Sequence, residues 1–139
     1  MDIFCLEDFK NEFDNLKDKK AYRTLEKDII DYFFNKTIKD LSSGTRLNNS
    51  DETPYIKKRL RGSGGYRVYF LILIKKESVY LMFIHPKTGP DESENITDES
   101  KSALYKKVLL CIKTNDLYNV TLNEGQNSVL FNRLLIVNS

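Results

Sequence analysis

Side chains able to act on a phosphodiester follow one another between residues 57 and 87. Arg67 and Tyr69 stand at spacing i, i+2 in one apolar segment, and His85 ends the next, with Lys87 two residues beyond. Histidine titrates near neutral pH, and lysine can act as a base where neighbouring cations lower its pKa. Arginine is a permanent cation that binds phosphate in a bidentate manner, and tyrosine can stack on a base or donate a proton. Such a set suits metal-independent RNA cleavage, in which the 2′-hydroxyl loses a proton, the 5′-oxygen gains one and the phosphorane needs positive charge.

Basic residues are concentrated in one segment of the chain. The 139 residues carry a net charge of +2, but residues 53–76 contain seven basic side chains and no acidic one, so the remainder carries −5. Within this segment Lys57, Arg59 and Arg61 alternate and would share one face of a strand, with Lys58 on the other. A localised basic patch favours a polyanionic partner. A hairpin edge kept soluble by its charges is the alternative, and charge alone does not separate the two.

Hydrophobic periodicity places these residues on three consecutive strands. Alternation with period two predicts strands over 55–61, 66–74 and 79–85. The glycine-rich stretch 62–65 connects the first two, because glycine supplies the positive φ of tight turns, and 75–78 connects the next two. Short connections between successive strands indicate an antiparallel meander. The meander would bring the arginines, lysines, tyrosine and histidine onto neighbouring strands about 5 Å apart.

Helical spacing precedes and follows the meander. A short apolar run over 2–6 predicts a first strand. Apolar residues at i, i+4, i+7 predict a helix over 8–16, for which Asp8 is the candidate N-cap. A second amphipathic helix is predicted over 21–36, and a third over 97–115 with Thr97 as N-cap. The order is therefore β-α-α-β-β-β-α. We expect an α+β fold in which an N-terminal helical hairpin packs on one face of a small twisted antiparallel sheet and leaves the other face partly open.

Two other regions are assigned more coarsely. Residues 40–54 are polar and rich in turn formers, which predicts a loop. Residues 116–139 contain two short apolar runs that fit either a hairpin or a strand followed by a short helix. No run of about 18 apolar residues is present, and the N-terminus does not resemble a signal peptide. We therefore expect a cytoplasmic protein without a membrane partner.

Metal and disulfide chemistry are not indicated by the sequence. Cys5 and Cys111 are far apart and each has apolar neighbours, so we expect both thiols to be reduced and in the core. The single histidine and the lack of a cysteine cluster leave no zinc-binding spacing. We predict no metal site and no cofactor.

Each candidate site residue also has an ordinary structural interpretation. A histidine at the end of a strand, such as His85, is more often structural than catalytic. Arg67 is flanked by apolar residues and could be a half-buried ion-pair partner, and Tyr69 could be a packing residue. The glycines could serve the turn alone, since no Gly-Lys-Ser/Thr of a phosphate-binding loop follows a strand.

Two segments carry a resemblance to a known family. The stretches RGSGGYRVYFLI and VYLMFIHPKTGPDESENITDESKSALYKKV, with the element order above, resemble toxins of the RelE/HigB superfamily from bacterial type II toxin–antitoxin modules. The resemblance covers about residues 2–114. It implies a RelE-like domain over 1–115, and we expect the extension over 116–139 to pack on the same domain. This chain is longer than most members.

The resemblance implies a function for the basic residues. Members of this superfamily enter the ribosome and cleave mRNA, and a cognate antitoxin neutralises them. By position, Arg67 matches the phosphate-contacting arginine, His85 the tyrosine or histidine at the strand end, and Lys87 the lysine that follows. We expect these three residues to be catalytic. The expected RNA-binding residues are Lys57, Arg59, Arg61 and Tyr69.

Relatives with the same fold leave a second function open. ParE-like members poison DNA gyrase and lack the basic catalytic set, whereas this chain keeps it, which favours the nuclease. A non-catalytic gyrase inhibitor and an inactive relative that binds RNA or an antitoxin are the alternatives.

Overall fold

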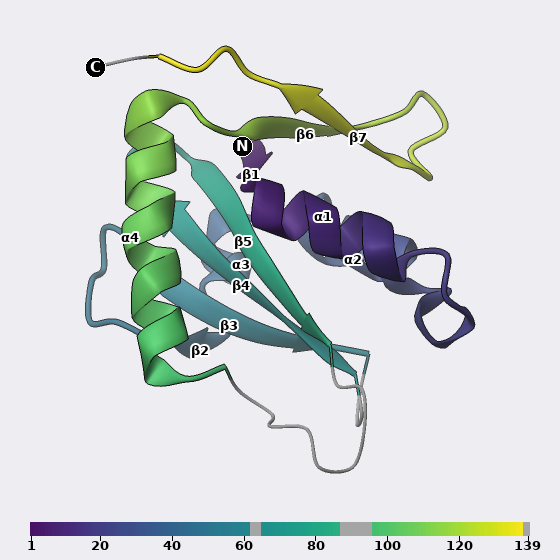
Figure 1. Cartoon of the computed structure of the whole chain (residues 1–139), viewed down its shortest axis with the longest axis horizontal. Coiled ribbons are helices and arrows are strands. Elements are labelled where there is room, and N and C mark those ends of the chain that lie inside the picture. The colour runs from purple at the N-terminus through teal and green to yellow at the C-terminus, as the bar shows by residue number, and fades with distance from the viewer. Residues whose placement is uncertain (62–64, 87–95, 138–139) are drawn as a thin grey trace.

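The described part of the chain forms one mixed sheet with helices on both faces. The computed structural model describes residues 1–61, 65–86 and 96–137 (Figure 1). Within them the strand order is β2-β3-β4-β5-β1-β6-β7. The strands are β1 (Asp2–Cys5), β2 (Thr45–Arg46), β3 (Tyr55–Leu60), β4 (Tyr66–Leu73), β5 (Ser78–Pro86), β6 (Tyr118–Leu122) and β7 (Val129–Arg133). The helices are α1 (Glu7–Leu16), the 3-10 helix η1 (Lys20–Tyr22), α2 (Leu25–Phe33), α3 (Ile38–Leu41) and α4 (Asp98–Thr114).

The α+β class is confirmed, and so is the antiparallel meander of β3, β4 and β5. The expectation of a small antiparallel sheet is wrong in two respects. The sheet has seven strands in the described residues, and β1 runs parallel to β5. That parallel pairing is possible because α1, α2 and the meander form a long connection between the two strands.

Strand β4 lies near the middle of the sheet and is buried on both faces. Val68, Phe70 and Ile72 belong to one core together with the apolar residues of α1 and α2, such as Phe9. The alternate residue Tyr69 and its neighbour Leu71 belong to a second core on the opposite face, as period two requires. Burial on both faces explains why β4 is almost continuously apolar and why a buried arginine within it is unusual.

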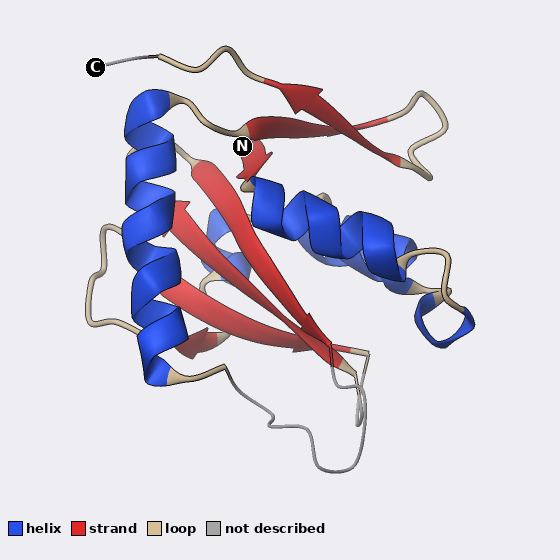
Figure 2. Cartoon of the chain, viewed as in Figure 1, coloured by secondary structure: helices blue, strands red, loops and turns tan. Residues whose placement is uncertain are grey.

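Helix α4 covers part of the face that we expected to be open. Its buried residues Val108 and Cys111 pack in the second core with Tyr55, Tyr80 and Met82. The helices therefore do not all lie on one side of the meander, because the sheet also has an apolar surface on its second face. Figure 1 and Figure 2 show that α4 crosses the strands, while the C-terminal end of β5 lies beyond it.

The caps of the helices agree with the sequence at α4 but not at α1. The Thr97 hydroxyl accepts a hydrogen bond from the Ser100 amide at 3.1 Å, and Asn115 ends α4 in the left-handed conformation. In α1 the N-cap is Leu6, so Asp8 lies inside the first turn rather than capping the helix. Helix α2 is shorter than the predicted range 21–36, since η1 forms its own turn before it. No helix in the described residues is both long and apolar enough to span a bilayer.

The segment predicted as a loop begins with ordered structure. Helix α3 is held by a capping box, in which Thr37 and Asp40 exchange hydrogen bonds between side chain and backbone. Strand β2 then pairs with β3 at its outer edge, opposite Ile56 and Lys57. The pattern Thr-x-x-Asp could have predicted the start of α3 from the sequence. Strand β2 has only two residues, which are too few to show the alternation typical of a strand.

The C-terminal residues continue the same sheet. Strands β6 and β7 form an antiparallel hairpin, and β6 pairs with β1 through Cys5 and its neighbour Phe4. Of the two interpretations left open for this region, the hairpin is therefore correct. The Glu26 carboxylate of α2 accepts a hydrogen bond from the Val129 amide at 2.9 Å, which ties β7 to the first helical layer.

The last residue of the connection between β3 and β4 must be glycine, because the backbone there leaves no room for a side chain. Gly62–Gly64 lie outside the described residues, but Gly65 is described and has no left-handed φ. A Cβ at Gly65 would overlap the carbonyl oxygen of Leu60 and come within 2.8 Å of that of Arg61. Among the described residues of this connection, Arg61 is the left-handed one, with φ of 63°.

Gly65→Ala should therefore destabilise the protein, because the Leu60 carbonyl cannot move without disturbing the β3–β4 ladder. We expect a loss of about 1–3 kcal/mol in the free energy of unfolding, measured by chemical denaturation. Gly125→Ala is the matched control, since its Cβ would meet only side chains, Asn127 at 3.3 Å and Asn123 at 4.0 Å. Equal effects of the two substitutions would contradict this role of Gly65.

Candidate functional site

Three predicted site residues lie in one row across the sheet. Arg59 of β3 is directly opposite Arg67 of β4, and Arg67 is directly opposite His85 of β5. Residues opposite each other in antiparallel strands have their Cβ atoms about 5 Å apart and share a face. The sequence thus placed these residues correctly relative to one another, and we call Arg59, Arg67 and His85 the cationic row.

Burial differs strongly along the cationic row. The outer residue Arg59 is exposed and His85 is half-buried, whereas Arg67 is only 3% exposed. Like charges directly opposite each other in a sheet repel, and Arg59 stands directly opposite Arg67. An anion that reaches Arg59 would offset this repulsion, and burial would strengthen its interaction with Arg67.

The neighbouring row combines one basic residue with two aromatic ones. Lys57 is opposite Tyr69, and Tyr69 is opposite Phe83. Lys57 is half-buried, on the same face as the cationic row. The Phe83 ring lies 6.4 Å from the His85 ring, centroid to centroid, and so forms an apolar wall beside the histidine.

Tyr69 does not have the RNA-stacking position that we expected. Its side chain is fully buried in the core beneath α4, and its hydroxyl accepts a hydrogen bond from the Ile96 amide at 3.4 Å. Burial also raises the pKa of the Tyr69 hydroxyl. A ring packed in this way cannot stack on a nucleotide. Tyr69 instead holds the start of the segment that leads into α4.

Arg61 is not on the face predicted for it. Strand β3 ends at Leu60, and the left-handed φ of Arg61 interrupts the alternation. Its guanidinium donates a hydrogen bond to the Ala21 carbonyl in η1, on the side of the sheet covered by the first two helices. Lys58 points to that side as predicted, with its ammonium 5.3 Å from the centre of the Tyr32 ring. Lys87 lies outside the described residues.

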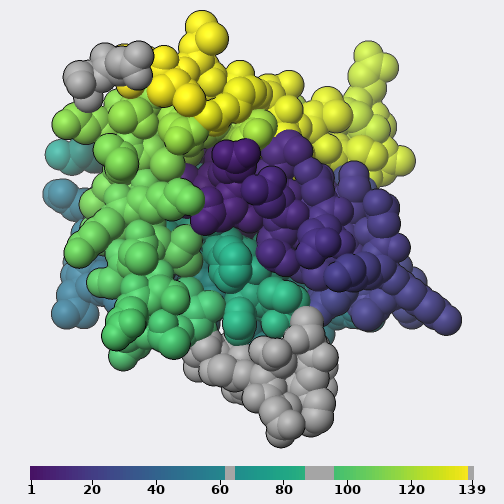
Figure 3. Space-filling model, viewed as in Figure 1, coloured from purple at the N-terminus to yellow at the C-terminus, as the bar shows by residue number. Residues whose placement is uncertain are grey.

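A cavity of about 350 Å³ opens beside His85, between α4 and the start of α1. Figure 3 shows part of β5 at the surface between these two helices. We call this cavity the α1–α4 groove. It is lined by Asp8, Phe83, His85, Ile96, Ser100, Ala103, Leu104 and Lys107.

Sequence reasoning missed the polar residues of the α1–α4 groove. The Lys107 ammonium donates a hydrogen bond to the Asp8 carboxylate at 2.7 Å, and this ion pair joins residues 99 positions apart. The Asp8 carboxylate raises the pKa of Lys107 through this hydrogen bond. No local pattern identifies such a pair, because each residue alone is an ordinary charge on a helix surface.

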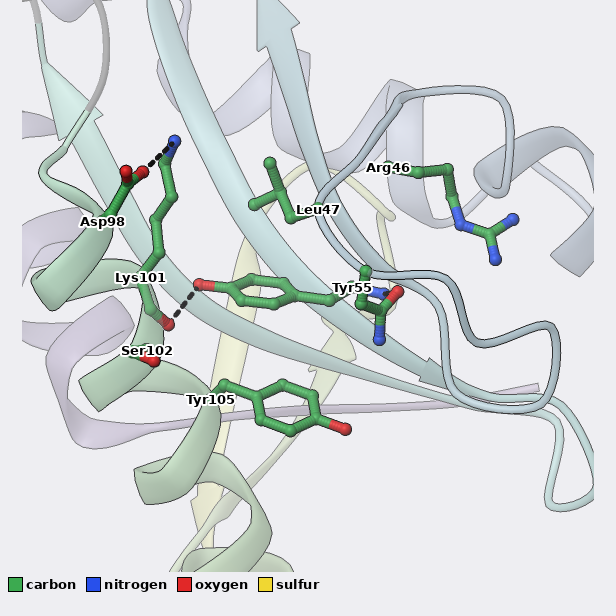
Figure 4. Close-up of a pocket in the computed structure, with 8 residues that line it drawn as sticks. Arg46, Leu47, Tyr55, Asp98, Lys101, Ser102 and Tyr105 are labelled. Atoms are coloured by element: carbon green, nitrogen blue, oxygen red, sulfur yellow. Dashed lines mark hydrogen bonds and ion pairs between the residues drawn. The ribbon is translucent and has the colours of Figure 1, made fainter.

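A second cavity, of about 490 Å³, lies on the other side of α4 (Figure 4). Its polar groups largely bond to one another. The Tyr55 hydroxyl donates to the Lys101 carbonyl at 3.0 Å, and the Lys101 ammonium lies 3.6 Å from Asp98. The Tyr105 ring stacks on Tyr55, with centroids 5.6 Å apart. These contacts fasten α4 to β3, so we assign this cavity to packing.

The two cysteines are buried, as predicted. Burial raises the pKa of both the Cys5 and the Cys111 thiols, which disfavours the nucleophilic thiolate. In the described ranges no three His, Cys, Asp or Glu side chains form a group that could hold a metal ion.

Neither the family models nor the curated proteins supply a relative on which a site could be based. No family model matches the chain, and the search of curated proteins returns no match. We therefore infer function from the residues of the site.

Replacing Arg59 by glutamate tests whether the cationic row costs stability. Arg59→Glu turns a like-charge pair across β3 and β4 into an attractive one, so we expect the free energy of unfolding to rise by about 0.2–1 kcal/mol. Chemical denaturation at low salt is the measurement, and the rise should shrink at high salt. A destabilised Arg59→Glu protein would mean that Arg59 has a structural role.

Proposed function

We propose that this protein is an RNA-cleaving toxin of the RelE/HigB kind, which cuts mRNA on the ribosome and is neutralised by a cognate antitoxin. Its fold would be a RelE-like β-α-α-β-β-β-α domain, to which the C-terminal hairpin adds two strands. The observation that carries the proposal is the cationic row, in which two arginines and the histidine lie side by side. Adjacent cations of this kind repel one another, and a bound phosphodiester would offset that repulsion.

The reaction that fits the cationic row is attack of the RNA 2′-oxygen on the adjacent phosphorus. The new O–P bond gives a 2′,3′-cyclic phosphate, and the P–O5′ bond breaks. His85 would transfer a proton, either from the 2′-hydroxyl or to the leaving 5′-oxygen, and such positioned transfer contributes about 10²- to 10⁴-fold. Lys87 is our candidate for the second proton transfer.

The remaining basic residues would bind and stabilise charge. Exposed Arg59 and half-buried Lys57 would hold the RNA backbone. Arg67, which is buried, would stabilise the phosphorane by its charge. A buried cation acts strongly because the effective dielectric constant around it is lower than that of water. Because Arg61 binds the η1 backbone, we do not assign it to RNA binding.

The burial of Arg67 and Tyr69 favours a second candidate, a non-catalytic relative. In that case the face would bind RNA, an antitoxin or gyrase through Arg59 and Lys57, and Arg67 would serve the fold. Supercoiling assays with purified gyrase separate the gyrase inhibitor from the nuclease. RNA binding without cleavage would identify the inactive relative.

Induction in bacteria followed by mapping of mRNA 5′ ends tests the nuclease. We expect new 5′ ends within coding regions, and growth arrest. His85→Ala should reduce cleavage about 10²- to 10⁴-fold. Arg67→Met, which keeps an unbranched apolar chain in the core, should abolish toxicity while the protein stays folded.

Lys58→Gln is the matched control, because Lys58 is adjacent to Arg59 on β3 but points to the opposite face. It should cleave as the wild type does, whereas Arg59→Gln should cleave less. Unchanged mRNA and normal growth with the wild-type protein would refute the nuclease, and full toxicity of folded Arg67→Met would refute the site.

A further inference from the structure

The α1–α4 groove has apolar sides and one charged end. Phe83, Ile96 and Leu104 contribute apolar surface, and His85 lies beside Phe83 on β5. The Asp8–Lys107 ion pair connects α1 to α4 at the groove. Its volume of about 350 Å³ is near the lower end of the range of small-molecule sites, about 300–1,000 Å³, which suits a single planar ring system.

The ion pair offers a donor and an acceptor side by side. An ammonium has three N–H donors and a carboxylate has two acceptor oxygens, so the 2.7 Å bond between Lys107 and Asp8 uses only part of what each can make. The Asp8 and Lys107 side chains retain 30% and 51% exposure, so both can meet a ligand in the groove.

Guanine is the nucleobase whose edge matches this arrangement best. Its O6 accepts a hydrogen bond, as the Lys107 ammonium requires. Its neighbouring N1–H and N2–H both donate, and together they can bond a carboxylate in a bidentate manner, as Asp8 requires. The other three bases lack two adjacent donors beside an acceptor.

We propose that the α1–α4 groove binds a guanine base of the RNA, read by Asp8 and Lys107, and so gives cleavage a preference for guanine. The inference rests on the proposed function. His85 lines the same groove, so a nucleotide bound with its base between α1 and α4 has its backbone near the cationic row. Single-stranded RNA allows this, because its bases can leave the stack and bind in protein pockets.

Titration with the four ribonucleoside monophosphates tests the groove without the ribosome. Backbone amide NMR shifts of Ala103 and Leu104 report occupancy. We expect GMP to bind more tightly than AMP, CMP or UMP, and Asp8→Asn and Lys107→Met each to weaken GMP binding on the order of 10-fold. The matched controls are Glu7→Gln and Lys106→Met, which change exposed neighbours on the same two helices.

The double variant Asp8→Lys/Lys107→Asp separates recognition from folding. It keeps an ion pair between α1 and α4 but exchanges the positions of donor and acceptor, so it should stay folded and lose the GMP preference. Equal binding of all four nucleotides by the wild type, or an unchanged GMP preference in folded Asp8→Asn, would overturn the proposal.

Mapping of cleavage sites distinguishes the two proposals from each other. Cleavage with a guanine preference that Asp8→Asn removes supports both. Cleavage whose base preference does not change in Asp8→Asn retains the nuclease and overturns the guanine groove. GMP binding in the groove without any mRNA cleavage retains the guanine site and overturns the nuclease.

Discussion

The register of β3, β4 and β5 is the constraint on which the candidate site depends. Side chains alternate between faces with period two, so a slip of one residue would move Arg59, Arg67 and His85 to opposite faces of the sheet. Several features fix the register. Val68 and Phe70 are buried on one face and Tyr69 on the other, and Gly65 packs tightly against the carbonyl of Leu60. The same pairings that bury both cores thus align the cationic row.

Helix α4 determines how much of this face can meet a ligand. It covers the Tyr55 end of the strands through aromatic stacking and through the hydrogen bond from Tyr55 to Lys101. Near the other end, the Ile96 amide bonds the Tyr69 hydroxyl just before the helix begins. Between α4 and α1 no helix or strand of the described residues covers the sheet, and the α1–α4 groove leads to His85 there. The helix therefore both completes the fold and forms one wall of the proposed base site.

The order of the main elements and the faces of β3 and β4 were predictable from the sequence, because they depend on local periodicity. The alternation of β4 and the Thr97 cap are examples. The faces of β5 were not, because its pairing with β4 shifts register between Tyr69 and Phe70, so Leu81 and Phe83 belong to opposite cores.

The covered second face was not predictable, since α4 joins it through contacts far apart in the chain. Arg61 itself adopts the left-handed conformation at the end of β3, and this turns its side chain away from the predicted face. We had expected the neighbouring glycines to adopt that conformation. Predicting the β6–β7 hairpin from the sequence would have required knowing that β6 pairs with one edge of β1.

The candidate site was predicted in part for the same reasons. Arg59, Arg67 and His85 follow from strand alternation and short turns, so the sequence was sufficient to place them in one row. The burial of Tyr69 depends on the position of α4. The Asp8–Lys107 pair joins two helices distant in sequence, and no spacing rule connects them.

Salt dependence of RNA binding is the most direct test of the claim that the cationic row binds a phosphodiester backbone. Fluorescence anisotropy with a labelled oligoribonucleotide between about 50 and 200 mM salt gives the slope of log affinity against log salt, and each phosphate contact contributes about −0.7 for a single strand. We predict that Arg59→Gln makes the slope shallower by about 0.7, while Lys58→Gln leaves it unchanged. Equal slopes for the two variants, or binding that does not depend on salt, would contradict the account.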